Sequence, residues 1–377
     1  MAHAYTPGLL VVDRMVLEEE RRLPLKGQVL VNLGDKVNSG DIVARTELPG
    51  NPELVNVANK LGVEPAEVPG TVKAAKKKDG DFVKKDELLA ISKSFFGLFT
   101  NTCNSPINGT VEHISNTTGK VLVRAPAIPV EVKAYIDGEI VKVIPDEGVL
   151  VKSFGTFIQG IFGVGGETVG EIFSLTDDPT AVIEPSDIKE EHKDKVLVGG
   201  ALLPYDTIQA CIKVGVKGFI TGGFDDADLK KFIGFDLGVA ITGSENLGLT
   251  LIVTEGFGKI RMADKTFNLL RKNVGRKASI NGATQIRAGV IRPEVIISLP
   301  ETDDQTISEE KEHTGMKIGS IIRVIREPRF GELAKVISLP VQLQQVQSET
   351  KVRVVEVQMR DETKWTLPRA NVEIVEE

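Results

Sequence analysis

A single carboxylate lies among the glycines that end the apolar segments of residues 195–258. Glu255 is the only acid beside these glycines, and it would be the general base if the protein were an enzyme. Thr254 precedes it, and four glycines would let a ligand approach the backbone closely: Gly222, Gly223, Gly256 and Gly258. One carboxylate does not define a reaction, so these residues mark a candidate ligand site with Glu255 as its only candidate catalytic residue.

Polar side chains are crowded between the glycines of residues 279–293, where the neighbouring segments are apolar. The candidates for anion binding are Thr284, Gln285, Arg287 and Arg292. Planar guanidinium groups suit phosphate or carboxylate, and the threonine and glutamine would add neutral hydrogen-bonding groups. The two arginines would equally pair with Glu255, with Glu294 or with another subunit. The segment therefore indicates either an anion site or structural ion pairs.

Strands alternating with helices would position these residues. The expected strands are KVLVGG, GFITGG, VAITG and LIVTEGFG, and helices are expected over 204–214, 227–233 and 260–273. Such an alternation favours right-handed crossovers and a parallel or mixed sheet. Because open α/β sheets bind ligands at the carboxyl ends of their strands, we expect the glycines to line a crevice there.

Length and composition limit the classes of function. With 377 residues the chain exceeds what one core usually serves, so two or three domains are expected. The 41% hydrophobic and 26% charged residues are those of an ordinary soluble protein. A formal net charge of -7 argues against a protein dedicated to coating nucleic acid.

Sequence motifs for metals, cofactors and membranes are absent. The two cysteines are far apart and the four histidines have no metal-ligand spacing, so no metal site is expected and a reducing, cytoplasmic location fits best. No Walker motif or nucleophile elbow occurs, and no cofactor is expected. The start of the chain reaches charged residues too early for a secretory signal, and we expect no membrane span.

A short pattern occurs twice in the first part of the chain. Residues 34–41 (GDKVNSGD) and 80–87 (GDFVKKDE) both place Gly-Asp before a valine and then a second turn and an apolar strand. The pattern resembles the turns of biotinyl and lipoyl domains, which implies a barrel-sandwich hybrid. The Met-Lys-Met-like tip that carries the cofactor in those domains is not present here, so the resemblance implies a fold and no carrier function.

A second resemblance covers about the last sixty residues. Residues 318–336 contain Gly-x-x-x-Arg-Val, a Pro-x-Phe-Gly turn and a closing Lys-Val. This pattern resembles the KOW motif of the NusG and ribosomal-protein families, which implies an SH3-like barrel that docks proteins or RNA. Charges are nearly balanced and aromatic residues are few, namely Phe330 and Trp365, so protein docking is favoured and RNA or ribosome binding remains an alternative.

These patterns predict a multidomain protein that combines an α/β domain with all-β domains. A duplicated barrel-sandwich domain is expected over residues 1–178 and a central α/β domain over 179–300. An acidic linker over 301–314 and a KOW-like, SH3-like barrel over 315–377 complete the predicted chain.

The predicted function is that of a non-catalytic adaptor or scaffold that docks protein partners and self-associates. It rests on two modules of binding type that flank a domain without a complete catalytic constellation. One alternative is an enzyme or small-ligand sensor that binds a phosphate or carboxylate group at the strand ends. Another is a transcription- or translation-associated factor that acts through the C-terminal barrel.

Overall fold

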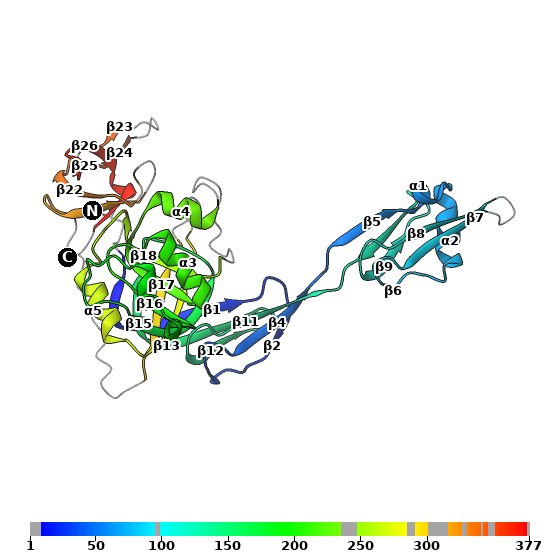
Figure 1. Cartoon of the computed structure of the whole chain (residues 1–377), viewed down its shortest axis with the longest axis horizontal. Helices are drawn as coiled ribbons and strands as arrows, with labels where there is room; N and C mark the ends of the chain where they lie inside the picture. The colour runs from blue at the N-terminus through cyan, green and yellow to red at the C-terminus, as the bar shows by residue number, and fades with distance from the viewer. Residues whose placement is uncertain are drawn as a thin grey trace.

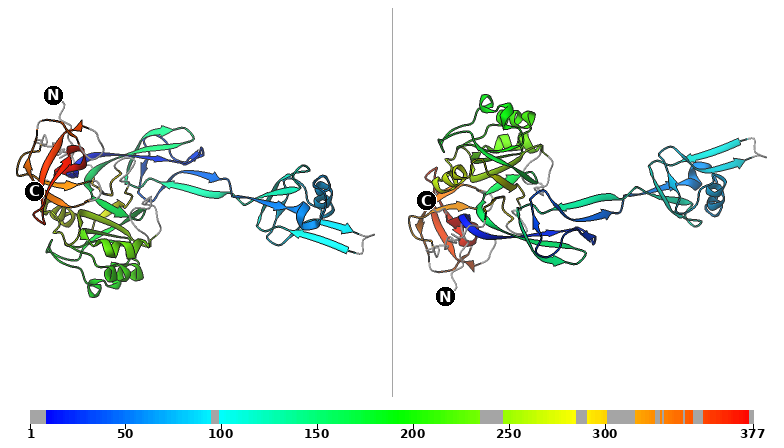
Figure 2. Two further views of the ribbon diagram at one scale, coloured as in Figure 1. Left: turned by 90° about the horizontal axis from the view of Figure 1, so that it is seen from above. Right: turned by 90° about the horizontal axis from the view of Figure 1, so that it is seen from below.

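The computed structural model describes residues 9–94, 99–234, 247–284, 291–300, 316–325, 329, 331–340, 342–345 and 351–374. They form mostly β-strands in several sheets, with few helices, which is a mixed α/β plus all-β organisation. Figure 1 shows a large body from which an arm projects, and the arm ends in a small unit. The views in Figure 2 show the same separation. Among the described helices, none is long and apolar enough to cross a bilayer.

An eleven-stranded mixed sheet forms the body. Its strands are β1 (Val11–Arg22), β3 (Lys36–Val37), β12 (Gly138–Ile144), β13 (Gly148–Gln159), β14 (Phe162–Val164), β15 (Glu167–Ser174), β16 (Lys195–Val198), β17 (Gly218–Phe224), β18 (Thr250–Phe257), β19 (Lys277–Asn281) and β20 (Glu294–Ser298). The order is β14-β18-β17-β16-β15-β19-β20-β13-β12-β3, and β1 pairs with β13. Strands β15 to β18 run parallel, which confirms the parallel arrangement expected for the glycine-ended strands that are described. The strand expected at 239–243 lies outside the described residues.

Three helices cover the two faces of this sheet close to their expected positions. They are α3 (Tyr205–Val214), α4 (Asp226–Ile233) and α5 (Asp264–Lys272). Helices α3 and α4 share one core with Leu197, whereas α5 shares the core on the other face with Val198. Because successive residues of a strand point to opposite faces, strands covered on both sides need the continuous apolar runs found in this sequence.

The arm is an insertion. At its base β4 (Ile42–Leu48) pairs with β2 (Gln28–Val29) and β11 (Ile128–Lys133). The distal unit, residues 52–124, contains β5 (Pro52–Asn56), α1 (Val57–Leu61), α2 (Val68–Ala74), β6 (Phe82–Val83), β7 (Leu88–Ser94), β8 (Phe99–Asn104), β9 (Gly109–Ile114) and β10 (Lys120–Arg124). It has a hydrophobic core of its own, which includes Val72 and Val111. The chain thus leaves through β4, folds the distal unit and returns through β11 (Figure 1).

The sequence repeat makes the same backbone contacts in both of its copies. In the first copy the Ile140 N–H donates to the Asp35 carbonyl oxygen, and in the second the Val111 N–H donates to the Asp81 carbonyl oxygen, both at 2.9 Å. The duplication therefore reaches beyond the Gly-Asp turns to the strands β12 and β9. The short segments that lead into these strands are also alike: Ile136-Asp137-Gly138 and Ile107-Asn108-Gly109.

The two copies lie apart, in contrast to the single duplicated domain expected over residues 1–178. The first copy is at the base of the arm, where its core includes Ile296 of the central sheet, and the second copy is the distal unit. Strands β13, β14 and β15 precede the expected boundary, yet they pair with β20, β18 and β16. Local patterns do not reveal pairing between strands so far apart in sequence, so the boundary expected at 178 runs through the central sheet.

The C-terminal unit is a five-stranded antiparallel sheet in the order β26-β25-β22-β21-β27. Its strands are β21 (Ile321–Val324), β22 (Leu333–Ser338), β25 (Val354–Met359), β26 (Lys364–Pro368) and β27 (Val372–Ile374), and β23 (Gln344–Gln345) and β24 (Lys351–Val352) form a separate pair. Short 3-10 helices occur at Pro65–Glu67, Pro185–Asp187, Glu190–His192 and Arg369–Asn371. Ile325, just after β21, joins the core of α3 and α4, so this unit packs on the body. The linker expected over 301–314 lies outside the described residues.

Candidate functional site between the central and C-terminal sheets

The glycines at the end of β17 lie against backbone. A Cβ added at Gly222 would be 2.5 Å from the Ile260 carbonyl oxygen, and one added at Gly223 would be 2.0 Å from the Gly258 carbonyl oxygen. Both distances are far shorter than van der Waals contact, so a side chain at either position would push the backbone apart. The two glycines permit the loop after β18 to pack on β17, and the space beside them is filled.

The glycines after Glu255 bring the C-terminal unit onto the end of β18. A Cβ added at Gly256 would be 2.4 Å from the Gly331 carbonyl oxygen, which belongs to the C-terminal unit. Gly258 has a φ of +95° and its N–H donates to the Phe224 carbonyl oxygen at 2.8 Å, so it forms the turn that follows the strand. The C-terminal unit therefore covers much of the edge where an open crevice was expected.

Glu255 is buried at this junction with both of its carboxylate oxygens engaged. The Ala263 N–H donates to Oε1, and Nη2 of Arg323 donates to Oε2, each at 3.0 Å. The side chain of Glu255 is only 8% exposed. A carboxylate held in this way accepts hydrogen bonds from the protein and is poorly placed to take a proton from a substrate.

Arg323 extends this contact into a network of four charged side chains, of which Glu255, Arg323 and Glu373 are buried and Arg292 is partly buried. Its Nη1 donates to Oε1 of Glu373 at 2.9 Å, and Arg292 forms an ion pair with the other oxygen of Glu373. The network joins β18, β21 and β27, and it contains two positive and two negative side chains. Arg292 thus has a structural partner, one that was not among the acids considered from the sequence. Removal of one member of such a buried ion pair strongly destabilises a protein, because the other charge stays buried without a partner.

The hydroxyl groups of Thr254 and Thr284 bond to the backbone of neighbouring strands. The Thr254 hydroxyl donates to the Thr221 carbonyl oxygen at 3.3 Å. The Thr284 hydroxyl bonds to β14, since it accepts from the Gly163 N–H at 2.8 Å and donates to the Gly163 carbonyl oxygen at 3.0 Å. Two further predicted residues, Gln285 and Arg287, lie outside the described residues.

A small cavity of about 50 Å³ remains beside the ion network. It lies between the end of β18, the N-terminus of α5 and the C-terminal unit. The polar or charged residues that line it include Gln159, Thr254, Glu255, Lys265, Thr266 and Arg323. Two of the predicted site residues, Thr254 and Glu255, therefore do face a cavity, although a much smaller one than an open crevice.

Sequence reasoning missed Arg323 and Glu373, which complete the site. Each lies in a short apolar strand, IIRV and VEI, and the structure buries both almost fully, at 1% and 0% exposure. A charge inside an apolar strand was the available signal, because buried charges need partners. The signal does not identify the partner, since the ion pairs of Arg323 span 68 and 50 residues of sequence.

A second cluster of titratable groups lies where the base of the arm meets the central sheet. Arg21 donates to both carboxylate oxygens of Glu167, at 2.7 and 2.6 Å, and lies 5.1 Å from the ring centroid of Tyr135. Burial, and then the charge of Glu19, raises the pKa of Glu294 to about 7. Tyr135 is buried with a φ of 70°, which is rare for an aromatic residue. A carboxyl group with a raised pKa and an unusual backbone conformation occur at functional sites and also at buried structural contacts.

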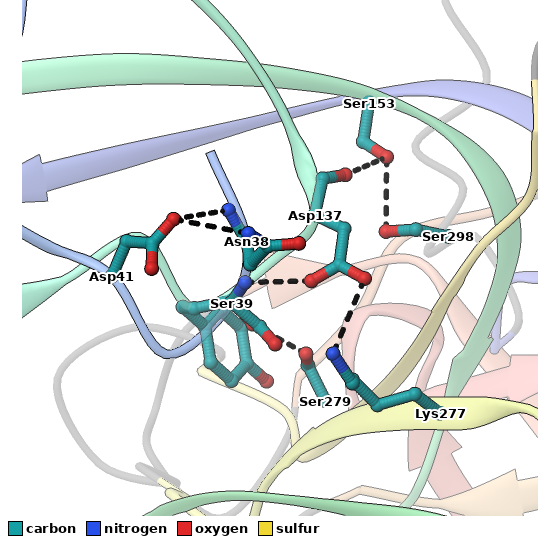
Figure 3. Close-up of polar contacts among 9 residues, drawn as sticks. Asn38, Ser39, Asp41, Asp137, Ser153, Lys277, Ser279 and Ser298 are labelled. Carbon is teal, nitrogen blue, oxygen red and sulfur yellow. Dashed lines mark hydrogen bonds and ion pairs between the residues drawn. The ribbon is translucent and has the colours of Figure 1, made fainter. Parts of the chain in front are cut away.

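Figure 3 shows the turn at residues 38–41, where the base of the arm meets the central sheet. The Ser39 N–H donates to Oδ1 of Asp137 at 2.6 Å, and Lys277 of the central sheet lies 3.5 Å from Oδ2. The equivalent position in the distal unit is a neutral Asn108, whose Oδ1 accepts from the Lys85 N–H at 2.7 Å. The charged residue thus occurs in the copy that contacts the central sheet. These contacts are best explained as structural ones that hold the base of the arm on the central sheet.

Comparisons with known proteins give no further assignment. No protein-family model matches the chain, and no curated protein matches it. Any function must therefore be argued from this chain's own residues.

Proposed function

We propose that the protein is a non-catalytic adaptor that docks protein partners and self-associates, with the distal unit as one of its docking modules. The observation that carries this proposal is the arm, which holds residues 52–124 away from the body (Figures 1 and 2). The distal core is formed by residues within 55–123. A unit that has its own core and is held away from the body is suited to contact other molecules.

Charge supports an acidic partner or a second copy of the chain. Residues 52–124 contain ten Lys or Arg and eight Asp or Glu, a formal charge of +2, while the whole chain carries -7. The rest of the chain therefore carries a formal net charge of -9. Attraction between the distal unit of one copy and the body of another would favour self-association, and it would weaken as salt increases.

A non-catalytic role is supported by the surroundings of Glu255. Both of its oxygens accept hydrogen bonds, and its partner Arg323 fixes the C-terminal unit. The KOW-like pattern supports a second docking surface on that unit. There the Arg329 guanidinium lies 4.6 Å from the ring centroid of Trp365. Both cysteines are free and buried, which fits the cytoplasmic location that we propose.

Excision of the arm tests this proposal. The ends of the insertion adjoin, since the Ala125 N–H donates to the Asn51 carbonyl oxygen at 3.0 Å, so a short Gly-Ser linker can replace residues 52–124. Affinity purification with quantitative mass spectrometry should recover fewer partners with the excised variant than with the full chain. Sedimentation should show weaker self-association.

The excised variant must first show an intact body by circular dichroism. If it then retains every partner and the same oligomeric state as the full chain, docking through the distal unit is ruled out. Truncation after His313 is a poorer test, because it would remove both Arg323, the charge partner of Glu255, and the unit that covers the end of β18.

A further inference from the structure

The buried guanidinium group of Arg323 has one donor without a partner. Nη1 and Nη2 bond to Glu373 and Glu255, whereas Nε has no hydrogen-bond partner among the described residues. Arg323 is 1% exposed and lines the cavity beside α5. An unpaired buried donor destabilises a protein, so an acceptor in the cavity would be favoured.

The N-terminus of α5 lies at the same cavity without a side-chain cap. Its N-cap residue is Ala263, which forms no side-chain cap hydrogen bond, and alanine is among the least favourable residues there. The cavity is lined by Ala263 and by Lys265 and Thr266 of the first turn. The helix dipole favours an anion at this end, where the carboxylate of Glu255 already accepts from the Ala263 N–H. Lys265 is exposed and adds a positive charge at the rim.

We propose that this cavity binds a small oxyanion, a phosphate or a simple carboxylate, between α5 and the C-terminal unit. The anion would accept from Nε of Arg323 and from the first turn of α5, with Lys265 balancing its charge. A cavity of about 50 Å³ holds about three or four waters, which suits an anionic group of about four or five heavy atoms. Bound there, the anion would strengthen the attachment of β21 to the central sheet. This site does not depend on the adaptor role.

Ligand-dependent stability of the full chain tests the site. Thermal unfolding is followed at constant ionic strength during titrations in which inorganic phosphate or acetate replaces potassium chloride. One of these anions should raise the unfolding temperature along a saturating curve. Lys265→Ala should weaken its binding by about threefold, because it removes one exposed positive charge at the rim of the cavity. Lys272→Ala, at the opposite end of the same helix, is the matched control and should leave the affinity unchanged.

A spectroscopic measurement locates the anion without a variant. In nitrogen-15-labelled protein, the Nε–H resonance of Arg323 should shift during the titration with the same midpoint as the thermal stabilisation. The proposal is overturned if neither anion stabilises the protein, if stabilisation does not saturate, or if both lysine variants respond as the unmodified chain does.

Discussion

The guanidinium group of Arg323 holds two carboxylates from different sheets, Glu255 of β18 and Glu373 of β27. All three side chains are buried, so removal of the arginine would leave two carboxylates shielded from water. We expect Arg323→Met to reduce the free energy of unfolding by about 3–5 kcal/mol. Urea unfolding measures this change. Arg329→Met is the control, since its ion pairs with Glu332 and Asp361 are exposed and should contribute less than about 1 kcal/mol. Equal losses in the two variants would contradict the role assigned to Arg323.

Glu294 should make stability depend on pH near neutrality. Its carboxyl has a pKa of about 7 in the folded protein, raised from the ordinary value of 4.5, so the folded state binds more protons between these values. The contribution of this group to stability is therefore present below about pH 4.5 and is lost as the pH rises through about 7. Glutamine mimics the protonated form. We expect Glu294→Gln to be more stable than the unmodified chain at about pH 8, by at most about 3 kcal/mol, and similar to it at about pH 4.

Urea unfolding at both pH values measures the effect of Glu294→Gln. The control is Glu18→Gln, because Glu18 is an exposed residue of β1, and its effect should be the same at both pH values. A stabilisation by Glu294→Gln that does not change with pH would show that Glu294 is not the titrating group.

Features of the site that depend on neighbouring residues can be predicted from the sequence, whereas contacts between residues far apart in the chain cannot. The strand-end position of Thr254 and Glu255 was predictable, because a glycine-ended apolar run in an α/β pattern indicates a carboxyl edge. The filling of that edge was not predictable, since it comes from Gly331 and Arg323, which are far away in sequence. The sequence indicates that arginines in this region can pair with acids, but only the structure shows that the partner of Arg292 is Glu373.

At the scale of elements, the close approach at the end of β17 depends on the absence of a side chain. We expect Gly223→Ala to destabilise the protein by about 1–3 kcal/mol, because the new methyl group would lie 2.0 Å from the Gly258 carbonyl oxygen. The control substitution should increase stability instead of lowering it. Gly70 lies in α2 with nothing within 4 Å of an added Cβ, so Gly70→Ala should stabilise the distal unit by about 0.5–1 kcal/mol. Thermal unfolding of both variants measures the difference, and a neutral Gly223→Ala would show that the loop yields easily.

Elements set by local patterns were predictable and those set by distant pairing were not. Helices α3 and α4 end at glycines in the left-handed conformation, Gly215 and Gly234, as the sequence indicated. Strand β15 was assigned to the N-terminal domain, because nothing local shows that it pairs with β16 and β19. The two Gly-Asp turns revealed the duplication, but their separation into a base and a distal unit follows from the insertion between β4 and β11.

For the whole molecule, the duplication offers a matched pair of positions that separates the arm from the body. Val111 and Ile140 make equivalent backbone contacts and are both fully buried, but Val111 lies in the distal core and Ile140 in a core shared with Ile296 of the central sheet. A buried aspartate destabilises either core by several kcal/mol. Val111→Asp should therefore unfold the distal unit and leave the body protected, whereas Ile140→Asp should expose strands of the body. Hydrogen exchange with peptide-level mass spectrometry reads the two regions separately. If Val111→Asp also removes protection from β16 and β17, the arm and the body fold as one unit, and an arm that moves or docks independently of the body is excluded.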